Sequence, residues 1–183
     1  MADTIPPVAA ASIDFILLAK SLSSSDFVKA CPWVFFVGRD ELEKPVGPSR
    51  TIVPGAMLAP GFEDEGSTAT YRIEEVVAPH MQVLALRKVQ PMFPSMITIG
   101  RTANNDIVVA DISVSKFHAY VRTAGDTIEL TDAGARNGTF VGTQQLEPNG
   151  AAVRIAPGMH VRFGRRNFDV LTAADTWTRI HKK

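Results

Sequence analysis

The sequence predicts a mainly β protein, an antiparallel β-sandwich preceded by a small α+β extension. Three observations predict this fold class. From residue 82 onward, short alternating runs of apolar and polar residues follow one another, with turns of Gly, Asn and Asp between them. Before residue 82, helix-like and turn-rich stretches replace that pattern, and after residue 174 the chain is helix-like again. We therefore expect an extension over residues 1–81, a sandwich over 82–174 and a short C-terminal helix or tail over 175–183.

The extension carries both helix and strand signals. Apolar residues gather in 13–22 and predict a short helix. A second helical segment follows, with a serine among residues 23–25 as its N-cap, Asp26 in its first turn and Pro32 at its end. Residues 33–40 are apolar and rich in β-forming side chains, which predicts a buried strand. We expect a long irregular connection over 41–67, which is rich in turn residues, and another strand over 68–77.

The sandwich region is a succession of short strand signals. In one of them, Ile128 and Leu130 point to one face of the predicted strand, and Thr127 and Glu129 point to the other. Beyond the last strand, Thr172 and Asp175 are spaced like a helix-capping pair. We expect strands at residues 82–89, 96–101, 106–109, 117–123, 127–132, 139–142, 151–155, 160–164 and 167–171.

Composition limits the classes of partner. Net charge is zero over the whole chain, but residues 1–81 carry −5 and residues 82–174 carry +3. That excess is small beside the basic character of general nucleic-acid binding domains, whose pI usually exceeds about 9. The single Cys31 excludes an internal disulfide. Without a signal-peptide pattern or an apolar run of the roughly 20 residues that cross a membrane, we expect a cytoplasmic protein with no nucleic-acid or membrane partner.

The sequence does not fully match the following catalytic and metal-binding patterns. Ser113-Val-Ser-Lys116 matches a β-lactamase motif formally, but the partner motifs of that class are absent. The chain has no glycine-rich phosphate loop. Its four histidines, at positions 80, 118, 160 and 181, lack metal-ligand spacing with one another or with Cys31. We therefore expect no enzymatic activity, no metal and no cofactor.

Three loop segments of the sandwich region carry an ordered set of polar residues. They are Gly100-Arg101, Ser115-Lys116-Phe117-His118 and Arg136-Asn137-Gly138-Thr139. Each follows or precedes a predicted strand, so the three loops can gather at one end of a sandwich. Guanidinium, ammonium, hydroxyl and amide groups are the donors that a phosphate monoester needs, because phosphate brings about 1.5 to 2 negative charges and three acceptor oxygens.

Residues 82–174 resemble a forkhead-associated (FHA) domain. The resemblance rests on the order Gly100-Arg101, Ser115-x-x-His118 and Asn137-Gly138, and on the flanking sequences IGRTANNDIVV, VSKFHA, DAGARNGTFV and VRFG. It implies an eleven-stranded antiparallel β-sandwich of the FHA/SMAD-like kind, which binds phosphothreonine peptides through loops at one end. FHA domains are among the modules that read phosphorylated motifs with arginine clusters.

The resemblance also implies roles for single residues. Arg101 and Ser115 would bind the phosphate, Lys116 and Arg136 would lie close to it, and Asn137 would bond the backbone of the peptide. Three further residues, Gly100, His118 and Gly138, would support the loops. The sequence departs from the family at Ala135, where serine is common, at Lys116, where arginine or asparagine is common, and at Arg136, where a small hydroxyl is common.

The partner implied is a protein carrying phosphothreonine, made by a Ser/Thr protein kinase pathway in which this chain acts as an adaptor. An alternative is a structural or oligomerising protein of the same fold whose binding does not depend on phosphate. A third interpretation assigns an enzymatic role to residues 1–81, although no catalytic pattern lies there. Retention of Arg101, Ser115 and Asn137 favours the first interpretation over the second.

Overall fold

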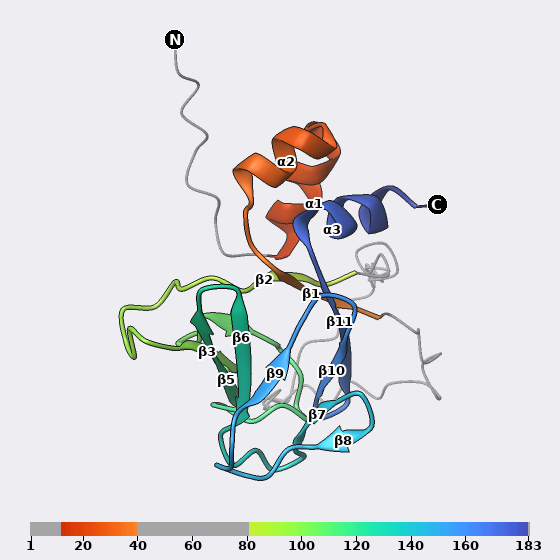
Figure 1. Ribbon diagram of the computed structural model, residues 1–183. Coiled ribbons are helices and arrows are strands. Elements are labelled where there is room, and N and C mark those ends of the chain that lie inside the picture. Colours follow the sequence, from red (N-terminus) through yellow and green to blue (C-terminus); the bar gives the residue numbers. More distant parts are fainter. Residues whose placement is uncertain (1–11, 40–80, 183) are drawn as a thin grey trace, which may run out of the picture. The chain divides into compact units, whose positions relative to one another are not determined.

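The computed structural model describes residues 12–39 and 81–182. The irregular connection expected over residues 41–67 and the strand expected over 68–77 lie outside the described residues. Within them, the chain forms eleven strands and three helices, and Figure 1 shows their arrangement.

The strands form two sheets (Figure 1). The first has six strands, in the order β2 (Val83–Ala85), β1 (Phe35–Gly38), β11 (Arg166–Leu171), β10 (His160–Phe163), β7 (Thr139–Val141) and β8 (Gln144–Gln145). The second has five, in the order β4 (Ile107–Val108), β3 (Ile97–Gly100), β5 (Ala119–Ala124), β6 (Thr127–Asp132) and β9 (Val153–Ile155). Ten of these strands overlap the runs predicted from the sequence; β8 was not predicted, because its two glutamines are exposed and carry no alternation.

The five-stranded sheet corrects one part of the predicted fold class. We expected antiparallel strands throughout, but β3 and β4 pair in parallel, with Ile99 opposite Ile107. A parallel pair ordinarily needs a crossover of a dozen or more residues, whereas these two strands are joined by residues 101–106 alone. Side-chain bonds support the short pair: the backbone N–H of Thr98 donates to the Asp106 carboxylate, and the backbone N–H of Asp106 donates to the Thr98 hydroxyl.

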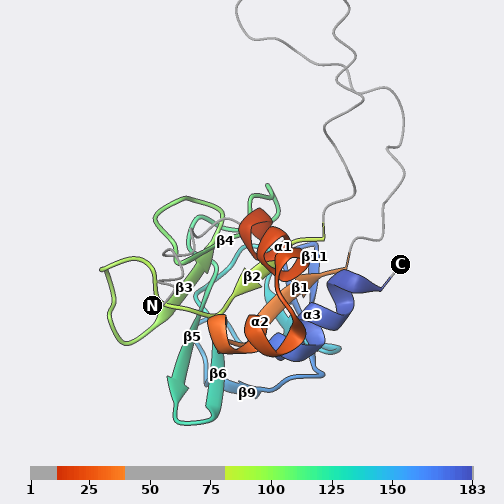
Figure 2. The same ribbon diagram turned by 90° about the horizontal axis from the view of Figure 1, so that it is seen from above.

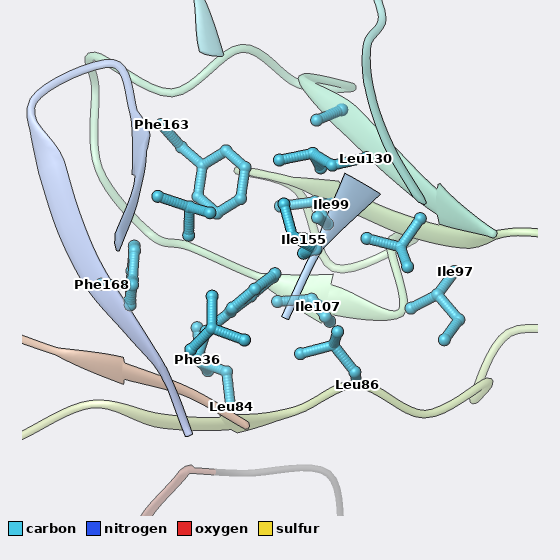
Figure 3. Packing of buried hydrophobic residues seen from close by; sticks show 14 of the residues in the cluster. Phe36, Leu84, Leu86, Ile97, Ile99, Ile107, Leu130, Ile155, Phe163 and Phe168 are labelled. Atoms are coloured by element: carbon cyan, nitrogen blue, oxygen red, sulfur yellow. The ribbon is translucent and has the colours of Figure 1, made fainter. Parts of the chain in front are cut away.

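The main core lies between the two sheets, and Figure 3 shows its packing. Three phenylalanines of the six-stranded sheet pack edge to face or tilted against one another, at centroid distances of 5.5 to 6.3 Å. They face aliphatic side chains from the other sheet. The labelled members of this core are Phe36, Leu84, Leu86, Ile97, Ile99, Ile107, Leu130, Ile155, Phe163 and Phe168.

A second core lies on the opposite face of the six-stranded sheet, under three helices. Phe36 points into the main core, while Phe35 and Val37 pack in this second cluster. Strand β1 is therefore buried on both faces, which explains why its sequence is a continuous apolar run rather than an alternating one. The predicted domain boundary assigns this strand to the extension; in the structure it lies between β2 and β11, so the sheet is built from both sides of residue 81.

The helices that cover this face lie together in both views (Figures 1 and 2). They are α1 (Ser12–Ser21), α2 (Ser24–Ala30) and α3 (Ala173–His181). Ser23 caps α2 and Thr172 caps α3, and each hydroxyl accepts a hydrogen bond from the backbone N–H three residues on. Cys31 is fully buried in this cluster, and burial raises the pKa of its thiol, with Arg87 opposing. Among the described residues, no helix is long and apolar enough to cross a membrane.

Candidate phosphate site

Strand directions bring the three polar loops to one end of the five-stranded sheet. Strand β3 ends at Gly100, and the antiparallel β5 begins at Ala119, so the loop after one lies beside the loop before the other. Strand β6 runs antiparallel to β5 and ends at Asp132, so the loop from residue 133 to 138 starts at the same end. Antiparallel order thus positions segments that are far apart in the sequence.

Direct hydrogen bonds join the loops, with Ser115 and its neighbours at the centre. The backbone N–H of Arg101 donates to the Ser115 carbonyl at 2.9 Å. The backbone N–H of Arg136 donates to the Ser115 hydroxyl oxygen at 3.1 Å. The Asn137 side-chain amide donates to the Ser113 carbonyl at 2.7 Å. All three loops are therefore fixed to the segment from residue 113 to 115.

His118 supports the same segment from the interior of the protein. It is fully buried, and its Nδ1 atom accepts a hydrogen bond from the Ser115 backbone N–H at 3.0 Å. Because Nδ1 accepts, we assign the ring hydrogen to Nε2, which then donates to the Gly138 carbonyl at 3.1 Å. Burial lowers the pKa of His118, although the bond to Gly138 and the charge of Asp132 oppose that shift. The neutral ring, which this pair of bonds requires, is thus favoured.

The two glycines of the predicted site stand where a side chain does not fit. A Cβ atom on Gly100 would overlap the Lys116 carbonyl, so the loops approach each other only because residue 100 has no side chain. Gly138 has a φ of +68°, and a Cβ atom there would lie 2.6 Å from the Gln145 side-chain nitrogen. A left-handed backbone conformation favours glycine at this turn.

The backbone around Lys116 depends on two residues that the sequence analysis missed. The Asn105 side-chain amide donates to the Lys116 carbonyl at 2.7 Å and to the Thr102 carbonyl at 2.9 Å. The Thr102 hydroxyl donates to the same Lys116 carbonyl at 3.0 Å. The only sequence signal was the turn-like composition of residues 102–105, which does not reveal a partner eleven residues away.

Asp132 holds the third loop, and the sequence analysis did not single it out. Its carboxylate is 1% exposed and accepts from the backbone N–H groups of Gly134 and Ala135 at 2.8 and 2.9 Å. Its other oxygen accepts from the Thr139 hydroxyl. An aspartate that bonds the N–H two residues on is a common turn former, and this is the signal that was available.

The exposed side chains of the site are mainly cationic. Arg101, Lys116 and Arg136 are exposed, Ser115 is half-buried and Asn137 is exposed. The Arg101 Nε atom donates to the Val114 carbonyl at 3.2 Å, which positions the guanidinium at the start of the loop. A hollow of about 380 Å³ adjoins this cluster. It is lined by Ile112, Ser113, Asn137, Arg162, Gly164 and Arg165.

The arrangement offers donors for an anion and no group of metal ligands. Among the described residues, no three His, Cys, Asp or Glu side chains gather closely enough to hold a metal ion. Asp111 accepts hydrogen bonds from Ser113, which lines the hollow. Burial raises the pKa of Asp111, but the bonds from Ser113 and the charges of Arg165 and Arg166 outweigh that effect and lower the pKa. The site can therefore hold an anionic group between several loops.

Comparison with known proteins decides the family. Residues 97–164 match the model of the FHA domain family. The chain contains an FHA domain. The matched residues begin at the first residue of β3 and end just after β10, so they include all three loops of the phosphate site.

Two curated relatives bear the names of an enzyme inhibitor and of a regulator. The chain is 36% identical over 66 residues to an oxoglutarate dehydrogenase inhibitor of Corynebacterium jeikeium. The aligned region covers 36% of this chain and 43% of that protein. The chain is 37% identical over 73 residues to the glycogen accumulation regulator GarA of Mycolicibacterium smegmatis, covering 40% and 44%. The chain thus spans less than half the length of these two relatives.

A solved structure gives a weaker similarity. The FHA protein EmbR of Mycobacterium tuberculosis, in complex with a low-affinity phosphopeptide, is 28% identical with a TM-score of 0.39. The similarity covers 43% of this chain and 20% of that one.

Proposed function

We propose that the FHA domain of this chain is a phosphothreonine-dependent protein-binding module. The observation that carries the proposal is the arrangement around Ser115. Its hydroxyl oxygen accepts from the Arg136 backbone N–H, its carbonyl accepts from the Arg101 backbone N–H, and Lys116 directly follows it in the chain. A phosphate group needs such converging donors from more than one loop, because its three acceptor oxygens point in different directions.

Ser115 and Arg101 each have a hydrogen-bond donor that is available to the phosphate. The Ser115 oxygen is already an acceptor for Arg136 N–H, so its own hydrogen is free to donate to a phosphate oxygen. The Arg101 Nε atom is used by Val114, and among the described residues no partner occupies its two terminal nitrogens. A guanidinium fork can bond two phosphate oxygens at once, and such charge-assisted bonds are roughly twice as strong as neutral ones.

The remaining roles are assigned by position. Lys116 and Arg136 add positive charge beside the phosphate, and Asn137 bonds the backbone of the peptide near the phosphothreonine. Gly100, His118 and Gly138 keep the loops at their separation through the contacts described above. These groups bind a ligand and do not react with it, so the module is non-catalytic. It acts as an adaptor in the cytoplasm. Its partner is a protein phosphorylated by a Ser/Thr kinase.

Titration with matched threonine and phosphothreonine peptides tests the proposal. We expect binding of the phosphorylated peptide and at least tenfold weaker binding of the other, since loss of a bond to a charged group costs about 1.5 to 3 kcal/mol. The Arg101→Ala variant should lose most of this difference in affinity between the two peptides. Arg154→Ala removes an exposed side chain on β9 and is the control, which should keep the difference. Equal affinity for both peptides would favour the alternative, an FHA-fold protein whose binding or oligomerisation ignores phosphate.

A further inference from the structure

Three aromatic rings form a ladder on the surface next to the phosphate site. Phe93 stacks on Phe117 at a centroid distance of 6.3 Å and an interplanar angle of 23°, and Phe117 stacks on Tyr120 at 6.4 Å and 4°. The guanidinium of Arg122 lies 5.2 Å from the centre of the Tyr120 ring. Phe93 is 51% exposed and Phe117 is 41% exposed. We call Phe93, Phe117 and Tyr120 the aromatic ladder.

The loop that carries Phe93 is held in place by a buried carboxylate. Asp106, whose side chain is fully buried, accepts from the backbone N–H groups of Val89 and Gln90 at 2.7 and 2.6 Å and from the Lys88 ammonium at 2.8 Å. The same ammonium donates to the Met92 carbonyl at 2.6 Å. In Figure 1 this connection between β2 and β3 extends away from both sheets. It is thus a projection fixed by hydrogen bonds, and it carries the exposed Phe93.

The backbone at Phe93 is strained in a way that keeps the ring in the ladder. Its φ is +55°, a conformation that is unfavourable for a bulky side chain. The Phe93 carbonyl accepts from the Met96 backbone N–H at 3.0 Å, which closes the turn around it. Strained conformations persist where the surrounding structure enforces them, and they are frequent at ligand-binding positions. Here the strain maintains an exposed ring that contributes little to the core.

The middle ring of the ladder adjoins the phosphate site. Phe117 directly follows Lys116, whose carbonyl is fixed by Asn105 and Thr102, so this ring lies next to one of the proposed phosphate ligands. The spacing of the rings also matches an extended chain. Side chains on the same face of a strand are about 6.6 Å apart, since the rise is about 3.3 Å per residue, and the ring spacings are 6.3 and 6.4 Å.

We infer that the aromatic ladder binds an extended segment of the same phosphorylated chain, with apolar side chains at alternate positions on one side of the phosphothreonine. This inference rests on the proposed function, because the phosphate anchors the peptide beside Phe117, from which one ring lies on either side. A flat row of rings contacts apolar side chains over their whole length without requiring one particular shape. The ladder therefore selects partners by apolar pattern, beyond the phosphate itself.

The test uses the full chain and synthetic phosphothreonine peptides. One set is short; the other extends up to ten residues to either side, with leucine or serine at alternate positions of the extension. We expect leucine in one of the two directions to raise affinity roughly tenfold, a change that corresponds to about 1.4 kcal/mol. Phe93→Gly removes the outermost ring, and glycine adopts a φ of +55° without strain, so the variant folds.

Phe93→Gly should abolish the leucine advantage and leave the affinity for the short peptide unchanged. Leu17→Ser, which removes another side chain that is 60% exposed but lies on α1, should alter neither quantity. If the short peptide binds and leucine gives no advantage in either direction, the inference is wrong and the proposed function stands. If no phosphothreonine peptide binds, the proposed function fails first. A chain that self-associates and becomes monomeric on Phe93→Gly would show that the ladder contacts a second copy, which also overturns the inference.

Discussion

His118 shows how one side chain determines the geometry of a binding site that it never reaches. Its two ring nitrogens bond Ser115 and Gly138, which belong to two different loops, and its own backbone directly precedes β5. The ring also packs edge to face on Phe163 of the main core, at a centroid distance of 5.7 Å. The phosphate loops are therefore fixed to the core through this residue.

Replacement of His118 by alanine should loosen the loops and destabilise the fold. The change leaves the Ser115 N–H and the Gly138 carbonyl without their partner and opens a cavity, so we expect a loss of about 2 to 4 kcal/mol in the free energy of unfolding. Urea denaturation measures it, with His181→Ala as the exposed control. A loss below 0.5 kcal/mol would contradict the bracing role.

The lowered pKa of His118 predicts how stability depends on pH. Burial favours the neutral ring in the folded state, whereas the ring titrates near its ordinary pKa of about 6.5 in the unfolded chain. The unfolded state therefore binds more protons, and the contribution of His118 is complete above that value and declines as the pH falls below it. We expect the urea concentration at the midpoint of unfolding to decrease when the pH is lowered from 7 to 5. His118→Gln should flatten this part of the profile, and an identical slope in both proteins would disprove the assignment.

Single residues were predicted from the sequence where they belonged to an ordered motif. The structure brings Arg101, Ser115, Lys116, Arg136 and Asn137 to one end of the sheet, and their roles as ligands stay a prediction. Asn105 was missed because its partners are backbone carbonyls, which leave no mark on the sequence, whereas the sequence indicated Asp132 only as a turn residue. The aromatic ladder was missed as well, since its rings come from segments that only the folded chain brings together.

At the scale of elements, the short parallel pair of β3 and β4 depends on one carboxylate. Burial alone would raise the pKa of Asp106, but bonds from Lys88 and from the backbone of Thr98, Gln90 and Val89 outweigh it and lower the pKa to about 2. The same oxygens accept bonds from Thr98 of β3 and from the connection between β2 and β3, and Asp106 itself directly precedes β4. One buried acid thus joins three elements.

Asp106→Ala should therefore destabilise the fold more than loss of a surface charge. It leaves the backbone N–H groups of Val89, Gln90 and Thr98 without this acceptor and removes the ion pair with Lys88, for which we expect about 3 to 5 kcal/mol. In the unaltered chain this carboxylate contributes stability above its ordinary pKa of about 3.8, and the contribution is lost as the pH falls toward about 2. Acid titration monitored by circular dichroism measures it. An unchanged acid midpoint in Asp106→Ala would show that another group controls acid unfolding.

Periodicity predicted most elements and none of their pairings. Alternation of apolar and polar residues gave the strands of the sandwich, and the Thr172–Asp175 spacing marked the start of α3. The parallel pairing of β3 with β4 could not be predicted in this way, because it depends on a network of side-chain hydrogen bonds and not on the periodicity of apolar residues. Strand β8 has no alternation at all and exists because it pairs with β7.

At the scale of the whole molecule, the six-stranded sheet depends on β1. This strand pairs with β2 on one side and β11 on the other, and its Phe35 and Phe36 are fully buried in separate clusters. Removal of β1 exposes both cores and the edges of two strands. The FHA domain of this chain therefore needs residues that lie outside the part matched by the family model.

A fragment of residues 82–183 should consequently fail to fold cooperatively, although it contains the predicted sandwich. The full chain should show a single thermal transition, and the fragment should show a broad one or none. Phe36→Ala in the full chain is the milder form of the same change and should cost about 3 to 5 kcal/mol. Differential scanning calorimetry separates these outcomes, and a fragment that melts at the temperature of the full chain would disprove the need for β1.

The position of β1 also determines when the protein can fold during its synthesis. Arg39, directly after this strand, bonds Asp169 of β11, a residue 130 positions later in the chain. The ribosome therefore releases β1 long before its neighbour β11 exists, and both apolar faces of β1 stay uncovered until then. Sheets closed by such distant pairings fold slowly, typically in milliseconds to seconds. Apolar strands that are exposed for that time make a nascent chain prone to aggregation.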